Sequence, residues 1–296
     1  PNENTRYGVT FSSVYAQSLG LNVEKTYKKI LNELEVKAVR LPIYWSSVEK
    51  EDGILDWKQV DRLVTLSEEN NVKLTIVTGV KVPRWPECFV PNWAEVLSRS
   101  DRHQAALDFI ETTVNRYKDS PALERWQVEN EPFFPFGICE EITQKEFSQR
   151  VELVKKLDNH PIQLTVSGEL GPWKNLAKQS DILGISLYRK TYNDIFGYFI
   201  YPLSPEYYFF RARLVSEEVD KVIVSELQAE PWFSGPIESR PLTEWAGLFN
   251  KDDFQNQVEF VKNAKLDEVY FWGVEWWEYL RQKGNSSLWN EAKKLF

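Results

Sequence analysis

The sequence predicts an α/β fold, a single (β/α)8 TIM barrel, from three observations. Eight β-type runs alternate with eight amphipathic helical stretches along the whole chain. The length of 296 residues is normal for one such barrel. No linker, repeat array or low-complexity segment interrupts the alternation, so we assign residues 1–296 to one domain.

The expected strands are short, and several are continuous apolar runs, as parallel strands buried on both faces require. They cover residues 7–11, 38–43, 73–78, 123–128, 163–166, 182–187, 221–225 and 268–272. The expected helices cover residues 23–35, 56–70, 101–118, 143–158, 172–179, 206–219, 254–265 and 286–295. In the helix at 56–70, Val60, Leu63 and Val64 can share one face while the charged residues lie mostly outside it.

A doubly wound open sheet is the main structural alternative to a barrel. Such a sheet usually carries a Gly-rich first turn, but the sequence has neither a GxGxxG motif nor a P-loop. We therefore expect no nucleotide cofactor. Only two histidines, His103 and His160, are present, and the two cysteines lack metal-ligand spacing, so we also expect no metal site.

The charge balance favours a neutral ligand. The net charge of -8 disfavours nucleic acid and anionic lipid surfaces, both of which need clustered Lys and Arg. No apolar run reaches the length of a membrane-spanning helix. The chain begins at Pro1 rather than Met, so a leader or membrane anchor could have been removed, although none is visible.

Aromatic residues are abundant, with 12 Trp, 13 Tyr and 17 Phe. They can fill a core, or they can stack on the flat C–H face of a sugar ring. The loops after the third, sixth, seventh and eighth strands are long and aromatic, and barrel active sites lie on that face. The sequence therefore predicts a site for a ring-bearing ligand.

Two glutamates stand at strand tips. Glu131 follows the fourth strand within an Asn-Glu-Pro sequence, and Glu226 ends the seventh. These strands lie across the barrel mouth from each other, so the two carboxyl groups face a shared space, as glycoside hydrolysis requires. Glu129 and Glu230 are the rivals; Glu129 lies lower on its strand, where we expect a barrel-interior or loop contact, and Glu230 lies beyond its strand.

The chain resembles the large clan of retaining (β/α)8-barrel glycosidases that includes cellulases, xylanases and β-galactosidases. That clan carries its acid/base in an Asn-Glu motif after strand four and its nucleophilic Glu after strand seven. The resemblance implies that Glu131 is the acid/base and Glu226 the nucleophile. The sequence RLPIYWSSVE at 40–49 and the sequence FWGVEWW at 271–277 are similar to the clan's second and eighth strand regions.

One segment departs from the clan. Some families carry a His after strand three, where this chain has Thr-Gly-Val-Lys-Val-Pro at 78–83. Strands four and seven look more like the β-galactosidase-type members. We assign no single family from the sequence.

The resemblance implies a retaining hydrolase that cleaves β-glycosidic bonds in a neutral polysaccharide or oligosaccharide by double displacement. The alternative is a carbohydrate-binding barrel that has lost catalysis, against which the presence of both glutamates argues. An ester or amide hydrolase is a third hypothesis, but no Ser-His arrangement supports it.

Three polar residues are expected to support the reaction. In the clan an Arg in the position of Arg40 supports the nucleophile; an ion pair that closes the barrel top is its alternative role. Tyr188 can donate to the nucleophile or pack on Tyr192. Asn130 is expected to bond the sugar 2-hydroxyl, a contact that strengthens in the transition state.

The resemblance also suggests sugar-contacting residues. Trp272 is expected to lie under the reacting sugar, with Glu275 and Trp276 completing that subsite. Further stacking candidates on the loops, each nearly as suited to packing, are Trp45, Trp85 and Trp232.

Cys88 and Cys139 fall in loops that neighbour each other on the active face. A disulfide and two buried thiols are equally consistent with the sequence. We expect an extracytoplasmic or secreted protein. The aromatic segment 192–210 forms either a subsite wall or a contact surface for a partner or lipid.

Overall fold

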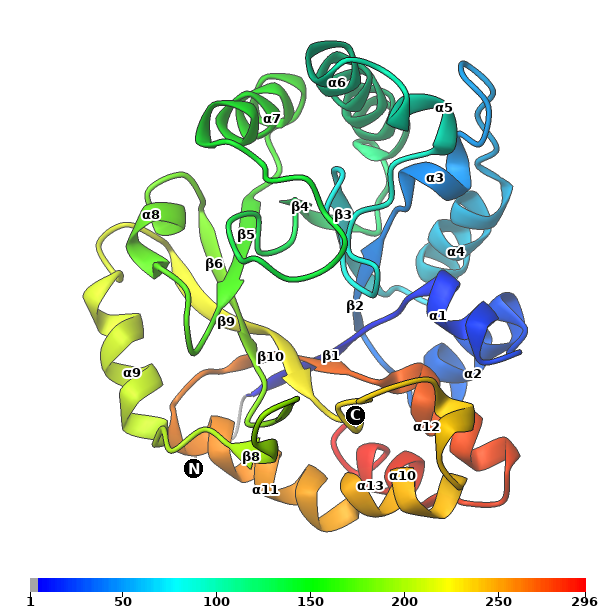
Figure 1. The fold of residues 1–296 in the computed structure, drawn as a ribbon, viewed down its shortest axis with the longest axis vertical. Coiled ribbons are helices and arrows are strands. Elements are labelled where there is room, and N and C mark those ends of the chain that lie inside the picture. The colour runs from blue at the N-terminus through cyan, green and yellow to red at the C-terminus, as the bar shows by residue number, and fades with distance from the viewer. Residues whose placement is uncertain (1–4) are drawn as a thin grey trace.

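A computed structural model describes residues 5–296 and confirms the expected barrel. Eight parallel strands close in the order β1-β10-β9-β6-β5-β4-β3-β2, with helices around them (Figure 1). The barrel strands are β1 Arg6–Thr10, β2 Ala38–Pro42, β3 Lys73–Thr78, β4 Leu123–Val128, β5 Ile162–Ser167, β6 Ile182–Leu187, β9 Lys221–Gln228 and β10 Glu268–Trp272. Each expected strand corresponds to one of these.

The eight expected helices are also present, with ends shifted by a few residues. They are α2 Val23–Glu33, α4 Lys58–Glu69, α6 Arg99–Tyr117, α7 Gln144–Leu157, α8 Trp173–Ala177, α9 Pro205–Leu214, α11 Lys251–Asn263 and α13 Ser287–Ala292. Side-chain caps fix several starts, because an oxygen there satisfies amides that the first turn leaves free. Thr143 begins α7 and Asn250 begins α11, each with a reciprocal capping box.

Several short elements on and around the strand-end loops were not expected from the sequence. The helices are α1 Ser13–Ser18, α3 Trp45–Val48, α5 Asn92–Glu95, η1 Ile237–Ser239, α10 Leu242–Leu248 and α12 Val274–Gln282. The most consequential is α12, because it turns the residues after β10 from a predicted loop into a helix whose inner face is buried.

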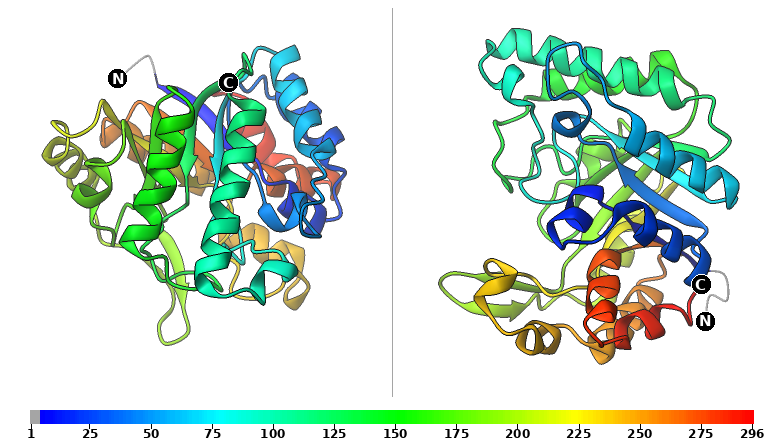
Figure 2. Two further views of the ribbon diagram at one scale, coloured as in Figure 1. Left: turned by 90° about the horizontal axis from the view of Figure 1, so that it is seen from above. Right: turned by 90° about the vertical axis from the view of Figure 1, so that its right-hand side faces the viewer.

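The aromatic segment 192–210 forms parts of a β-hairpin and of α9. Strands β7 Lys190–Asn193 and β8 Gly197–Ile200 pair antiparallel outside the barrel. The hairpin projects beyond the surrounding helices (Figure 2), and its turn exposes Ile195 and Phe196. Tyr192 packs on Tyr198 within the hairpin. Across residues 5–296, no helix combines the length and the apolar character needed to cross a membrane.

Candidate active site

The tip of β4 holds Glu131 through an unusual backbone path. Glu129 and Glu131 have left-handed φ angles of 58° and 45°, a conformation that costs a non-glycine residue about 1–3 kcal/mol. Neighbouring strands hold this path, because the amide of Glu129 donates to Thr78 at 3.0 Å and that of Glu131 to Thr165 at 3.2 Å. Hydrogen bonds to β3 and β5, on the two sides of β4, therefore hold Glu129 and Glu131 in this strained backbone conformation.

A bulge in β9 sets the direction of Glu226. Ile185 of β6 pairs with Val224, but the next residue, Ser186, pairs with Glu226, so Ser225 is the extra residue. A bulge of this kind re-aims the side chains that follow it. As a result, the carboxyl group of Glu226 meets polar side chains inside the barrel mouth.

Two donors from other strands hold the Glu226 carboxyl group. Arg40 of β2, which is completely buried, donates from Nη1 to Oε1 at 2.8 Å. Tyr188, just after β6, donates its hydroxyl to Oε2 at 2.9 Å. The other Arg40 nitrogens donate to Gln127 and Asn130, each at 2.7 Å, which fixes the guanidinium plane. This arrangement stabilises a negative charge on Glu226.

The Glu131 carboxyl group has a different environment. Ser186 donates to its Oε1 at 2.6 Å, and no described Lys or Arg forms an ion pair with it. Burial, followed by the charge of Glu226, raises the pKa of Glu131 to about 8. Because Ser186 is also the strand partner of Glu226, both carboxyl groups lie beside the same strand end.

Both rival glutamates are engaged in other contacts. Glu129 is completely buried, accepts backbone amides of the loop after β3, and forms an ion pair with Arg150 at 2.6 Å. This agrees with the expected loop contact. Glu230 forms an ion pair with Arg84.

The predicted sugar site around Trp272 already contains protein groups. The guanidinium of Arg84 lies 4.0 Å from the Trp272 ring centroid and 3.8 Å from that of Tyr15. Glu275 is completely buried, accepts from Arg84 at 3.0 Å and accepts the amide of Ser12. One face of Trp272 is therefore covered by Arg84, and Glu275 serves as a partner of that arginine.

Two further predicted sugar-binding residues lie in the core instead. Trp45 is completely buried on α3, and its indole N–H donates to Glu49 at 2.7 Å. Trp276 is completely buried on α12 and packs on Phe233 and Tyr279. We assign both rings to packing rather than to the substrate site, because the helices that carry them turn these side chains inward.

The other two tryptophans lie on the rim of the barrel mouth. Trp85 is 62% exposed and packs edge-on against Phe136, which in turn contacts Trp232. Trp232 contacts Tyr188 at a centroid distance of 5.7 Å. These rings form a continuous aromatic row that leads to the residue bound to Glu226. Phe136 was not among the sequence-predicted residues.

Sequence reasoning missed the charged residues of the loop at 79–89. Lys81, Arg84 and Glu87 are all buried beside the site. Lys81 donates to the carbonyl oxygens of Glu131 and Phe134 at 3.0 and 2.6 Å, so it holds the loop after β4. The only hint in the sequence was that this loop lacks the His that some families of the clan carry after strand three. That difference does not indicate where the side chains of the loop point.

Cys88 and Cys139 form a disulfide, with a Cα–Cα distance of 5.3 Å, which settles the alternative left open by the sequence. The bond joins the loop after β3 to the loop after β4. No group of three or more His, Cys, Asp or Glu side chains within residues 5–296 is arranged to hold a metal ion.

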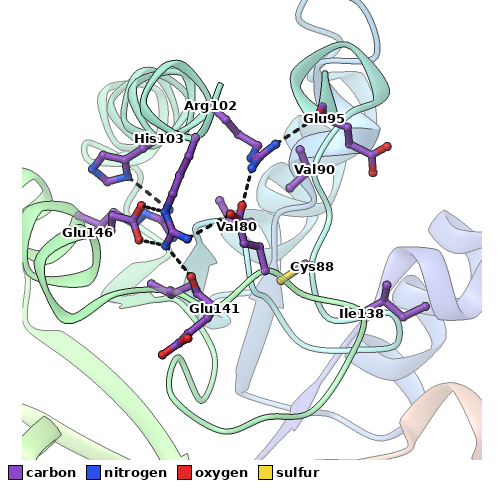
Figure 3. Close-up of a pocket in the computed structure, with 13 residues that line it drawn as sticks. Val80, Cys88, Val90, Glu95, Arg102, His103, Ile138, Glu141 and Glu146 are labelled. Atoms are coloured by element: carbon purple, nitrogen blue, oxygen red, sulfur yellow. Dashed lines mark hydrogen bonds and ion pairs between the residues drawn. The ribbon is translucent and has the colours of Figure 1, made fainter. Parts of the chain in front are cut away.

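A separate cavity of about 370 Å³ lies between the disulfide and the starts of α6 and α7 (Figure 3). Its charged groups are largely paired with one another: Arg99 with Glu146 at 2.7 Å, and Arg99 and Arg102 with Glu140. Neither Glu131 nor Glu226 lines it.

Comparison with known proteins places the chain among glycoside hydrolases. The sequence profile of glycosyl hydrolase family 10 matches residues 5–152. A curated relative, the β-galactosidase BgaA of Clostridium cellulovorans, is 18% identical over 230 residues, which is 71% of this chain and 34% of the relative. The chain thus spans about a third of that relative's length.

Solved structures share the fold. A GH5_18 protein from Bifidobacterium longum subsp. longum, in complex with Manb1-4GlcNAc, has a TM-score of 0.63 at 14% identity, over 90% of this chain and 68% of its own. Xylanase 10B from Thermotoga petrophila, in complex with xylobiose, has a TM-score of 0.60 at 15% identity, over 91% of this chain and 82% of its own.

Proposed function

We propose that this chain, which belongs to glycosyl hydrolase family 10, hydrolyses β-glycosidic bonds with retention of configuration. In this proposal Glu131 is the general acid/base and Glu226 is the nucleophile. The observation that carries it is a contrast between two carboxyl groups beside the end of β6. The pKa of Glu131 is raised, whereas Glu226 is bound by the guanidinium of Arg40.

The surroundings of Glu131 suit a proton donor. With a pKa of about 8, its carboxyl group is mostly protonated near neutral pH. It can therefore give a proton to the glycosidic oxygen as the bond to the anomeric carbon breaks. The leaving sugar departs as an alcohol, and Glu131 is left as a carboxylate that can act as a base in the second step.

The surroundings of Glu226 suit a nucleophile. Arg40 and Tyr188 each donate a hydrogen bond to its carboxyl group, which can attack the anomeric carbon as a carboxylate to form a covalent glycosyl-enzyme. Water then attacks the same carbon while Glu131 takes its proton, and Glu226 leaves as a carboxylate. Two displacements at one carbon return the original configuration.

Asn130 is proposed to bond the sugar 2-hydroxyl. Its Oδ1 accepts from Arg40 at 2.7 Å, so the amide nitrogen is directed away from Arg40. The amide nitrogen can then donate to the sugar 2-hydroxyl, and hydrogen bonds to this hydroxyl strengthen in the transition state. Trp85, Phe136 and Trp232 would stack on further sugar units.

We infer a neutral oligosaccharide or polysaccharide as substrate. The similar proteins are named for β-galactosides, or were solved with xylobiose or Manb1-4GlcNAc, all of which are uncharged. The chain's own net charge of -8 also disfavours an anionic ligand.

A panel of aryl β-glycosides, with the first product anomer followed by NMR, tests the proposal. We expect the β-anomer to appear first and then mutarotate. Release of the α-anomer would contradict the assignment of Glu226 as nucleophile. Absence of turnover across galactosides, glucosides, xylosides and mannosides would contradict the hydrolase assignment.

A further inference from the structure

The loop at 79–89 places a third carboxyl group, that of Glu87, beside the two proposed catalytic ones. Glu87 is buried, and its Oε2 accepts from Asn130 Nδ2 at 3.4 Å. Both Glu226 and Glu131 are close enough for their charges to act on it. The reaction proposed above does not use this group.

Several contacts hold Glu87 in place. Its φ of 75° is left-handed, and its backbone amide donates to Arg84 at 2.7 Å. Gly137 packs so closely that a Cβ built on it would lie 2.6 Å from the Cβ of Glu87. The next residue, Cys88, is bonded to Cys139. Two loops thus clamp this side chain in one place.

The carboxyl group is poorly satisfied by the protein itself. No described Lys or Arg forms an ion pair with it, and the described residues give it one long hydrogen bond, from Asn130. The ammonium group of Lys81, whose charge also acts on Glu87, donates instead to the carbonyl oxygens of Glu131 and Phe134. A buried carboxyl group with a single long hydrogen bond is costly, so a ligand that completes its hydrogen bonds would bind favourably.

We propose that Glu87 is a substrate-binding residue that recognises the 3-hydroxyl of the sugar whose 2-hydroxyl is bonded by Asn130. The inference rests on the proposed function. Adjacent hydroxyl groups on a pyranose are spaced like two hydrogen-bonded atoms, so neighbouring Asn130 and Glu87 groups match a 2,3-diol. The ligand class is therefore a neutral glycoside with both hydroxyls free.

Protonation fits this role. Burial, followed by the charges of Glu226 and Glu131, raises the pKa of Glu87 well above its ordinary value. A neutral carboxyl group can donate one hydrogen bond to a hydroxyl and accept another. It also adds no third negative charge beside Glu226, so the nucleophile is not disturbed.

The test pairs Glu87→Ala and Glu87→Gln with 4-nitrophenyl β-D-galactoside and β-D-xyloside and with their 3-deoxy analogues. We expect Glu87→Ala to lower kcat/KM on the parent sugar by about 10–100-fold, as loss of a buried hydrogen bond does. On the 3-deoxy sugar the loss should be less than about threefold, because the partner hydroxyl is already missing. Glu87→Gln should retain most activity on the parent sugar.

Glu140→Ala is the matched control, since Glu140 is exposed near the same disulfide and pairs with Arg99 and Arg102. Equal losses on the parent and 3-deoxy sugars would overturn the proposal, and so would full activity of Glu87→Ala. If Glu87→Ala changed only the pH profile, Glu87 would act by setting the pKa of Glu131. That result would also overturn the proposal.

Calorimetric titration separates this proposal from the proposed function. In a Glu226→Gln background without turnover, adding Glu87→Ala should weaken binding of the parent sugar by about tenfold and leave the 3-deoxy sugar unaffected. Equal affinities with and without Glu87 would overturn the role of Glu87, whatever the outcome for Glu226 as nucleophile.

Discussion

The tips of β4 and β9 carry the same side chain in opposite environments. Glu226 receives a guanidinium and a phenol, whereas Glu131 receives one serine hydroxyl and lies close to a negative charge. The proposed function needs this difference, because it gives an acid and a nucleophile from one residue type. The neighbours supplied by β2 and β6 make the distinction, and the glutamates themselves do not.

The largest effect is expected from removing the group that attacks. Glu226→Ala should lower kcat by about 10⁵-fold or more on an aryl β-glycoside, because loss of a covalent nucleophile removes both displacement steps. Added azide should restore turnover and give the α-glycosyl azide, identified by NMR. Glu230→Gln is the matched control, for which we expect a much smaller loss of kcat. An equal loss in Glu230→Gln would contradict the assignment of Glu226 as the nucleophile.

The rate loss caused by removing the proposed acid, Glu131, should depend on the leaving group. Glu131→Gln should lower kcat/KM by about 10²–10⁴-fold for an alkyl or sugar leaving group. A 2,4-dinitrophenyl glycoside needs no proton for departure, so its glycosylation rate should change little. Burst kinetics on both substrates measure this difference, and a uniform loss would contradict the acid role of Glu131.

Removal of one donor from Glu226 should have a smaller effect. Tyr188→Phe should lower kcat/KM by about 10–100-fold, because a hydrogen bond to a charged group contributes about 1.5–3 kcal/mol. Tyr192→Phe, in the hairpin outside the barrel, provides the control. Steady-state kinetics that show no difference between the two variants would show that the bond to Glu226 does not serve the reaction.

The smallest effect is the response to pH. Since the pKa of Glu131 is raised, the proton is present below about pH 8 and is lost above it, so activity should fall as pH rises through that value. Glu226→Gln removes the negative charge that is the second cause, so it should lower the pKa of Glu131. NMR titration of the carboxyl carbon measures the shift; a pKa unchanged by this substitution would contradict the electrostatic coupling.

The sequence predicted the barrel strands because each is a short β-type run between helical stretches, and several of these runs are continuously apolar. It placed Glu131 and Glu226 at strand ends on one barrel face, where barrel active sites lie. The structure brings both carboxyl groups beside the end of β6, and their catalytic roles stay a prediction. Arg40 and Tyr188 were also expected beside the proposed nucleophile, and both donate to Glu226.

The remaining features depend on tertiary structure that a local pattern does not contain. The buried positions of Trp45 and Trp276 follow from short helices on the strand-end side. The bulge at Ser225 has no sequence marker. Glu87 enters the site only because the loop at 79–89 turns through left-handed residues and is bonded to a segment 51 residues away.

Covalent trapping tests the central claim most directly. The enzyme is incubated with 2-deoxy-2-fluoro β-glycosyl fluorides of galactose, glucose and xylose, digested, and analysed by peptide mass spectrometry. The account predicts one fluoroglycosyl adduct, on the peptide that contains Glu226, and loss of activity in step with labelling. An adduct on Glu87, Glu131 or Glu230 instead would contradict it.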